Sequence, residues 1–217
     1  MKPLFIGYLL FLLPSFCGFA QNDSVKGFLF PDYREGVVTY KNGAKAKAQL
    51  NYNLATEEMR FISRQQNQEV IMILDNLPEV GSVIIDDRRF VPVNNAFYEC
   101  VTAGKGDYYI QRKISKIQRA KNTGLGYSTS SASSDVGYYS PQAKELESTD
   151  LFEEKVENTF YLKDSKNNYK KFNSAKLLEK LFKGHEAEID SYAKENSIDF
   201  TNQDAVTRIV KFAYDLN

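Results

Sequence analysis

The chain has 217 residues, with 28 basic and 28 acidic side chains, one histidine, two cysteines and no tryptophan. A balanced charge without a long basic run lacks the electrostatic footprint of a nucleic-acid-binding protein, so we expect no nucleic-acid partner. Zinc sites use several histidine or cysteine ligands, which this composition does not offer, and we expect no cofactor.

The first 20 residues have the pattern of a secretory signal peptide. Lys2 precedes an apolar run over residues 4–13, and Gly18 and Ala20 are small residues at the positions that a signal peptidase reads. The run is shorter than the roughly 20 apolar residues of a membrane-spanning helix. We expect cleavage after Ala20, export to the periplasm, the outer membrane or the exterior, and no transmembrane span in the mature chain. A buried N-terminal helix is the alternative.

The two cysteines are expected to stay unpaired. Cys17 lies inside the leader, and the bulky Phe16 before it disfavours a lipobox, so we favour cleavage over lipidation. Cys100 is then alone in the mature chain and cannot form an internal disulfide. Its place in the strand-like segment 97–101 indicates a buried, inert thiol rather than a nucleophile.

Residues 21–121 are predicted to form an antiparallel β domain. Asn42-Gly43 after residues 37–41 is typical of a hairpin with a type I′ turn, because both residues tolerate positive φ. Strict alternation over residues 44–52 places Ala44, Ala46 and Ala48 on one face, where their small size suggests that another layer approaches closely. Further strands are expected at 59–63, 69–74, 82–85, 89–93, 96–103 and 108–117.

Two of these strands and one proline carry more specific predictions. Residues 70–74 and 83–85 are continuous apolar runs rich in β-branched side chains, which favours strands covered on both faces. Pro92 indicates a strand at a sheet edge or a bulge, since proline has no N–H for the ladder. The segment 108–114 alternates less cleanly and is expected to end the first sheet.

Residues 122–149 differ in composition from the segments on either side. Glycine mixes with a serine-dense tract at 128–134, which indicates a flexible loop or linker. Tyr127, Tyr138 and Tyr139 are its only aromatic side chains. They either pin the loop to the body or form an exposed aromatic contact, and they are our candidate interaction residues.

Residues 150–217 are predicted to form a hairpin followed by about three helices. The hairpin at 158–172 is expected to rejoin the first sheet or rest on the helices, because an isolated hairpin is marginally stable. Ser174 begins a helix that ends at Gly184, Asn196 ends the second in a left-handed conformation, and Thr201 with Asp204 resembles a capping box for the third. The predicted fold class is therefore α+β, an antiparallel β-meander resembling a barrel or sandwich with a C-terminal helical cluster.

No group of residues in the sequence predicts catalysis. His185 lies at the start of a surface helix, which favours a packing or helix-end role, and no serine lies in a nucleophile elbow. We predict no catalytic, cofactor-binding or metal-binding residue. A hydrolase using carboxylates or a serine is the alternative, and it would require Asp86, Asp87 or Glu99 to share a pocket with another acid.

Short motifs at several places along the chain resemble those of uncharacterised secreted proteins of Gram-negative bacteria. They are residues 50–53 followed by 57–59, the segments 87–90 and 97–99, the glycine–serine stretch through 127–134, and the tail at 182–185 and 196–200. The resemblance covers most of the mature chain. It implies a secreted protein and provides no catalytic residue.

Together these patterns favour an exported, non-enzymatic envelope or cell-surface protein that acts as a binding or structural module. Its partner would be an envelope protein or another surface component. Pairing of the tail helices with a second copy is a further hypothesis, and the oligomeric state itself is not predicted.

Overall fold

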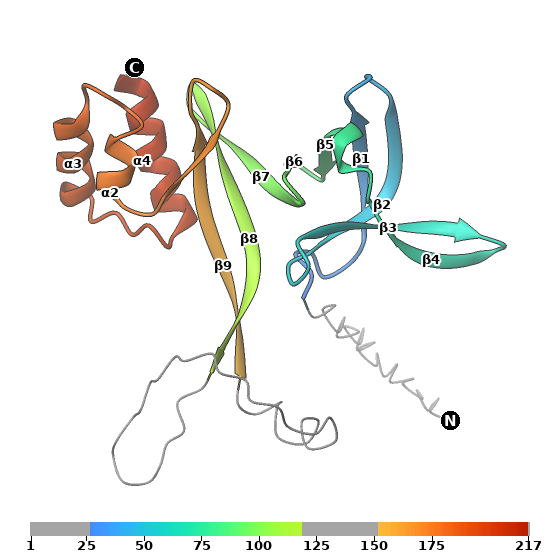
Figure 1. Cartoon of the computed structure of the whole chain (residues 1–217). Helices are drawn as coiled ribbons and strands as arrows, with labels where there is room; N and C mark the ends of the chain where they lie inside the picture. The colour runs from blue at the N-terminus through green and yellow to red at the C-terminus, as the bar shows by residue number, and fades with distance from the viewer. Residues whose placement is uncertain (1–26, 119–151, 217) are drawn as a thin grey trace, which may run out of the picture.

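The computed structural model describes residues 27–118 and 152–216 (Figure 1). Within these residues one antiparallel sheet of ten strands precedes three α-helices. The strands are β1 (Arg34–Tyr40), β2 (Lys45–Asn53), β3 (Glu58–Gln65), β4 (Gln68–Ile73), β5 (Val80–Ile85), β6 (Arg88–Val93), β7 (Ala96–Ala103), β8 (Gly106–Gln118), β9 (Phe152–Lys163) and β10 (Tyr169–Phe172). The helices are the 3₁₀ helix η1 (Leu77–Glu79), α2 (Ala175–Glu179), α3 (Glu186–Glu195) and α4 (Gln203–Leu216). The predicted α+β class is confirmed.

The strand order is β10-β9-β8-β7-β6-β5-β1-β2-β3-β4, which joins two consecutive meanders. They meet where β5 pairs with β1, whereas β4 pairs with β3 and ends the sheet. The ladder between β8 and β9 runs from the pair Tyr109–Tyr161 to the pair Gln118–Phe152. Strands from both sides of residues 122–149 therefore belong to one sheet, and the predicted C-terminal hairpin does rejoin it.

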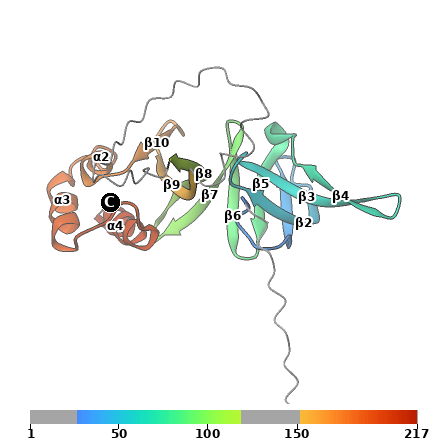
Figure 2. The ribbon, with the colours of Figure 1, turned by 90° about the horizontal axis from the view of Figure 1, so that it is seen from below.

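The first strands curl back over the middle of the sheet (Figure 2). β3 lies against β7, the backbone N–H of Ile114 donates to the carbonyl of Leu54 at 3.0 Å, and the Tyr52 hydroxyl donates to the carbonyl of Arg112 at 3.3 Å. The curl encloses a first hydrophobic core, formed mainly by Phe30, Val38, Leu50, Tyr52, Leu54, Met59, Val80, Val83, Ile85, Phe90 and Phe97.

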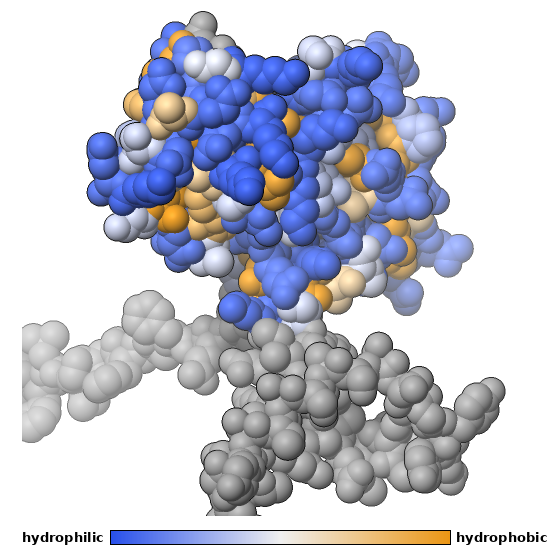
Figure 3. Space-filling model, turned by 60° about the vertical axis from the view of Figure 1, so that its left-hand side comes forward, coloured by the Kyte–Doolittle hydropathy of each residue, from blue (hydrophilic) through white to orange (hydrophobic). Residues whose placement is uncertain are grey.

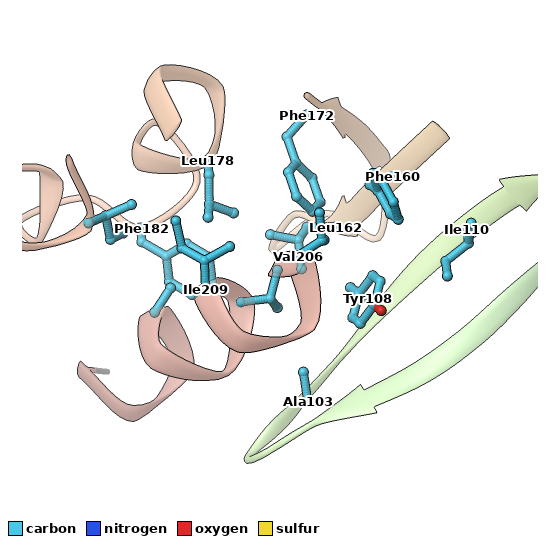
Figure 4. Close-up of a cluster of buried hydrophobic side chains, with 13 residues drawn as sticks. Ala103, Tyr108, Ile110, Phe160, Leu162, Phe172, Leu178, Phe182, Val206 and Ile209 are labelled. Atoms are coloured by element: carbon cyan, nitrogen blue, oxygen red, sulfur yellow. The ribbon is translucent and has the colours of Figure 1, made fainter. Parts of the chain in front are cut away.

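The three helices pack on the other half of the sheet and form a second core with β7 to β10 (Figure 4). In α4, Val206, Ile209, Val210 and Ala213 are fully buried at helical spacing, as the amphipathic pattern predicts. They meet Tyr108 and other buried side chains of the sheet. Figure 3, in which the helix side of Figure 1 is turned forward, shows a largely hydrophilic surface with scattered hydrophobic residues.

The first hairpin lies where the sequence predicts it, but the predicted turn type is wrong. Gly43 has φ of +87°, whereas Asn42 is not in the left-handed region that a type I′ turn requires. The N–H of Tyr40 donates to the carbonyl of Ala44 at 2.8 Å, and the N–H of Gly43 donates to the carbonyl of Tyr40 at 2.9 Å. This is a three-residue loop that ends in a glycine, the next most common hairpin connection.

The burial of β2 also differs from its alternating pattern. Ala44 and Ala46 are exposed, so no second layer approaches them, and from Leu50 onward both faces are buried. Asn51 explains why both faces of β2 are buried from Leu50 onward. Its side chain exchanges hydrogen bonds with the backbone N–H and carbonyl of Phe30 at 3.2 and 2.9 Å, which holds the entry segment against the sheet.

Three helix boundaries shift from their predicted residues. Helix α2 ends at Glu179, five residues before the predicted Gly184. The side chain of Asn202 accepts a hydrogen bond from the N–H of Ala205 at 3.0 Å and caps α4, while Thr201 bonds to Asp199 instead of forming a capping box. After α3 the left-handed residue is Ser197, with φ of +46°, and not Asn196. Short polar side chains compete for such positions, and the sequence pattern does not decide between neighbours.

Candidate functional site

The most exposed apolar strand is β4, one of the two edges of the sheet. Val70, Ile71, Met72 and Ile73 are 37–57% exposed. The prediction that this run is covered on both faces is therefore wrong, because the side chains of residues 70–73 are exposed on both faces. Among the described residues, β4 pairs with β3 alone. Ile84, in the second apolar run, is 40% exposed, so that strand is not covered on both faces either. In Figures 1 and 2 the β3–β4 hairpin extends away from the helices.

The backbone of β4 offers hydrogen-bonding groups along its free side. The N–H of Leu74, just after the strand, donates to the carbonyl of Met59 at 2.9 Å. Since N–H and C=O groups alternate in direction along an antiparallel strand, those of Met72 and Val70 face β3 and those of Ile71 and Ile73 face outward. A further strand could pair with these outward groups.

The opposite edge of the sheet has a different character. β10 carries the exposed Lys170 and Lys171, and its Phe172 is buried in the helical core. Lysines on an edge strand discourage other chains from adding to it, because their charge would have to be desolvated. Residues 70–73 carry no charge and no proline. The lysines of β10 therefore disfavour the addition of a further strand at that edge, whereas residues 70–73 of β4 would accept one.

A second candidate site is a cluster of buried charges between the two cores. Glu99 of β7 accepts hydrogen bonds from Arg88 of β6, with Nε at 2.7 Å and Nη2 at 2.6 Å, and from Nε of Arg112 of β8 at 2.6 Å. Arg112 also donates to Asn158 at 2.9 Å and to Gln203, the first residue of α4, at 2.7 Å. The cluster thus ties the middle strands to the helical half.

The charges of this cluster do not balance. The side chains of Glu99 and Arg112 are 6% and 10% exposed, and that of Arg88 is 26% exposed. Burial alone would raise the pKa of Glu99, but the hydrogen bonds and positive charges of Arg88 and Arg112 outweigh this and hold the pKa below its usual value. One carboxylate therefore lies between two guanidinium groups, with a net charge of about +1 on the three side chains.

The cluster forms one wall of a pocket of about 710 Å³. The β6–β7 ladder ends at the pair Arg89–Cys100, while β7 continues to Ala103, so Val101 lies beyond the last β6 partner. The remaining walls include Leu29 of the entry segment and Gln203. Polar and charged groups of four chain segments therefore converge on one opening.

The acids singled out from the sequence have different neighbours. Asp86 forms an ion pair with Arg34, and Asp87 is exposed on the rim of the pocket that Glu99 also lines. Although Asp87 and Glu99 share this pocket, both oxygens of Glu99 are bonded to arginine and its pKa is lowered, whereas a general acid needs a raised pKa. This arrangement does not support the hydrolase alternative.

Cys100 is buried, as predicted. Its Sγ accepts a hydrogen bond from Nη2 of Arg89 at 2.7 Å and lies 3.4 Å from Oδ2 of Asp107. Burial, followed by the neighbouring Asp107 carboxylate, raises the pKa of the thiol to about 11. Reactive cysteines have a lowered pKa, so these surroundings favour an inert thiol.

The other predicted site residues add little to either candidate site. His185 occupies the N-cap position of α3 and makes no side-chain capping bond. Tyr127, Tyr138 and Tyr139 lie outside the described residues. In the described ranges no cluster of three or more histidine, cysteine or acidic residues could hold a metal ion, and no helix there has the length and apolarity to cross a membrane.

Comparison with known proteins gives no relative for this chain: no family model, no curated protein and no solved structure matches it. Its function must therefore be inferred from the chain itself. Sequence reasoning missed the roles of Arg88 and Arg112. For Arg112 a signal existed, because it takes an inward position in the alternating series Tyr108, Ile110, Arg112, Ile114.

Proposed function

We propose that the protein is an exported, non-enzymatic binding module of the cell envelope or cell surface, and that it binds an extended segment of a partner protein at β4. The observation that carries the proposal is an edge strand that pairs on one side alone within the described part of the chain and has exposed apolar side chains on both faces. Export is supported by the signal-peptide pattern of residues 1–20.

Addition of a strand explains why both faces of β4 are apolar. Val70 and Met72 share one face of the hairpin, beside Ser63 and Phe61 of β3, while Ile71 and Ile73 share the other. A partner strand that hydrogen-bonds to the outward backbone groups would place its side chains alternately on the two faces. On one face they would lie beside Val70 and Met72, and on the other beside Ile71 and Ile73. In this mode the backbone hydrogen bonds provide affinity and the side chains provide specificity.

A different protein fits this edge better than a second copy of the chain. An antiparallel self-pairing that aligns most of residues 70–73 places Glu69 opposite Ile73, Leu74 or Asp75 of the other copy. Each of these arrangements leaves the carboxylate beside an apolar or an acidic residue, and like charges opposite one another are destabilising. A different partner can place a basic or polar residue opposite Glu69.

Site-specific photo-crosslinking in cells that produce the full chain tests the proposal. A photoreactive amino acid replaces Ile71 in one variant and Ile84 in a matched control. Ile84 is also exposed, at 40%, but lies on β5, which is paired on both sides. We expect an adduct with one exported protein from position 71 and none from position 84.

The crosslinked partner, once identified and purified, provides the second step. Ile71→Pro removes an outward N–H without removing a hydrogen bond to β3, and we expect it to weaken binding at least tenfold. Ile71→Val keeps the N–H and an apolar side chain, so we expect binding within about twofold of the original. A twofold change in affinity corresponds to well below the about 1.4 kcal/mol of a tenfold change. Equal binding by both variants, or an adduct between two copies of the chain, would contradict the proposal.

A further inference from the structure

The excess positive charge beside the pocket needs a partner. Arg112 and Glu99 are nine-tenths or more buried, and Arg88 is three-quarters buried. Because removing a charge from water is costly unless it is paired, two guanidinium groups sharing one carboxylate form a poorly compensated cluster. A second anion at the pocket would complete the pairing.

Arg88 is held in an orientation suited to such an anion. Its Nε and Nη2 atoms bond to Glu99, while its guanidinium carbon lies 5.2 Å from the ring centre of Phe30 and 5.6 Å from that of Phe90. Both distances lie within the roughly 6 Å at which a ring face attracts a cation, so the two rings help to hold Arg88 in place. A guanidinium has five N–H donors in a rigid fork, so the bonds to Glu99 leave donors that can bind the oxygens of a planar anion.

The pocket limits the size and charge of the ligand. Its volume of about 710 Å³ lies in the range of small-molecule sites. Leu29 and Val101 give apolar surface beside the arginines. Arg89 is paired with Asp107, and Asp87 on the rim is exposed to solvent. A dianion would exceed the excess charge and repel Glu99, whereas a monoanion matches it.

We propose that this pocket binds a small organic monocarboxylate, with its carboxylate on the remaining donors of Arg88, next to the positive charge of Arg112, and its apolar part against Leu29 and Val101. This site is distinct from the β4 edge and does not depend on the partner-binding function. In this assignment Glu99 orients the arginines through its hydrogen bonds and does not itself bind the ligand.

Titration of the purified protein with benzoate, benzamide and inorganic phosphate tests the assignment. Benzamide has nearly the shape of benzoate without its charge, and phosphate is a small anion without an apolar part. We expect saturable benzoate binding by calorimetry, at least tenfold tighter than that of either other probe. We also expect benzoate to shift the Nε–H nuclear magnetic resonance signals of Arg88 and Arg112.

Variants locate the binding to the pocket. Arg88→Gln should weaken benzoate binding at least tenfold. Arg64→Gln should leave it unchanged, because Arg64 pairs with Glu69 at the exposed β3–β4 hairpin. If Arg88→Gln does not fold, the Nε–H shifts of the unmodified protein decide the question.

Three results would overturn the assignment. The first is equal binding of benzoate and benzamide, and the second is phosphate binding as tight as that of benzoate. The third comes from an acetylated tripeptide with a free C-terminus, which presents the same carboxylate on a protein chain. Tighter binding of the tripeptide than of benzoate would show that the site recognises a peptide end and not a small molecule.

Discussion

Replacing Glu99 by glutamine should destabilise the protein more than any other single loss of charge in the described residues. The change keeps the shape of the side chain but removes the charge that two arginines share, through hydrogen bonds of 2.6–2.7 Å. Removing one partner of a buried ion pair costs about 3–5 kcal/mol. Because Arg88 is partly exposed and water reduces the cost, we expect about 3 kcal/mol.

Urea denaturation of the purified protein measures this loss. With a slope of about 2 kcal/mol per molar urea, the midpoint should fall by about 1.5 M. Glu69→Gln is the matched control, because its pair with Arg64 at 3.3 Å is exposed and should contribute less than about 1 kcal/mol. Equal midpoint shifts in the two variants would refute the reasoning.

The stability difference between the original protein and Glu99→Gln should depend on pH, and the sign of that dependence follows from the pKa of Glu99. The pKa of Glu99 is lowered by folding from its ordinary value of 4.5, so the unfolded chain binds the proton more readily. Its stabilisation is fully present above pH 4.5 and is lost as the pH falls through the lower folded-state pKa. The stability difference between the original protein and Glu99→Gln should therefore shrink below pH 4.5, and a difference that grows there would contradict the assignment.

Three further predictions concern packing and reactivity. A Cβ at Gly106 would lie 2.3 Å from the Tyr214 ring, so Gly106→Ala should lower the unfolding free energy by about 1–3 kcal/mol in urea denaturation. Cys100 should react with iodoacetamide at pH 8 much more slowly in the native protein than in urea, and equal rates would contradict its raised pKa. Ile209→Ala at a fully buried site should cost about 2–5 kcal/mol, against less than about 1 kcal/mol for Ile71→Ala on the exposed edge, by the same assay.

The positions of the strands could be predicted from the sequence because each depends on a local pattern. Alternation and turn residues indicated the strands from β1 to β8, and helical spacing indicated the buried face of α4. The burial of residues 70–73 could not be predicted in this way. An apolar run suits both a central and an edge strand, and only the pairing of β5 with β1 leaves β4 at the edge.

The charge cluster could not be predicted from the sequence, because it depends on contacts between residues far apart in the chain. Arg88, Glu99 and Arg112 come from three strands, and only the alternating series around Arg112 indicates in the sequence that one of these charges points inward. Their meeting depends on the register that places Phe90 opposite Glu99 and Glu99 opposite Ile110, so that inward positions of β6, β7 and β8 line up. The link from Arg112 to Gln203 also required the docking of α4, which no local pattern specifies.

Hydrogen exchange at β4 is the most direct test of the partner-binding claim. In the free protein, the N–H groups of Val70 and Met72 should exchange slowly because they face β3, and those of Ile71 and Ile73 should exchange rapidly. When the purified partner identified by crosslinking is bound, the account predicts that Ile71 and Ile73 become protected as well. Unchanged rapid exchange at both residues in the bound state would contradict it.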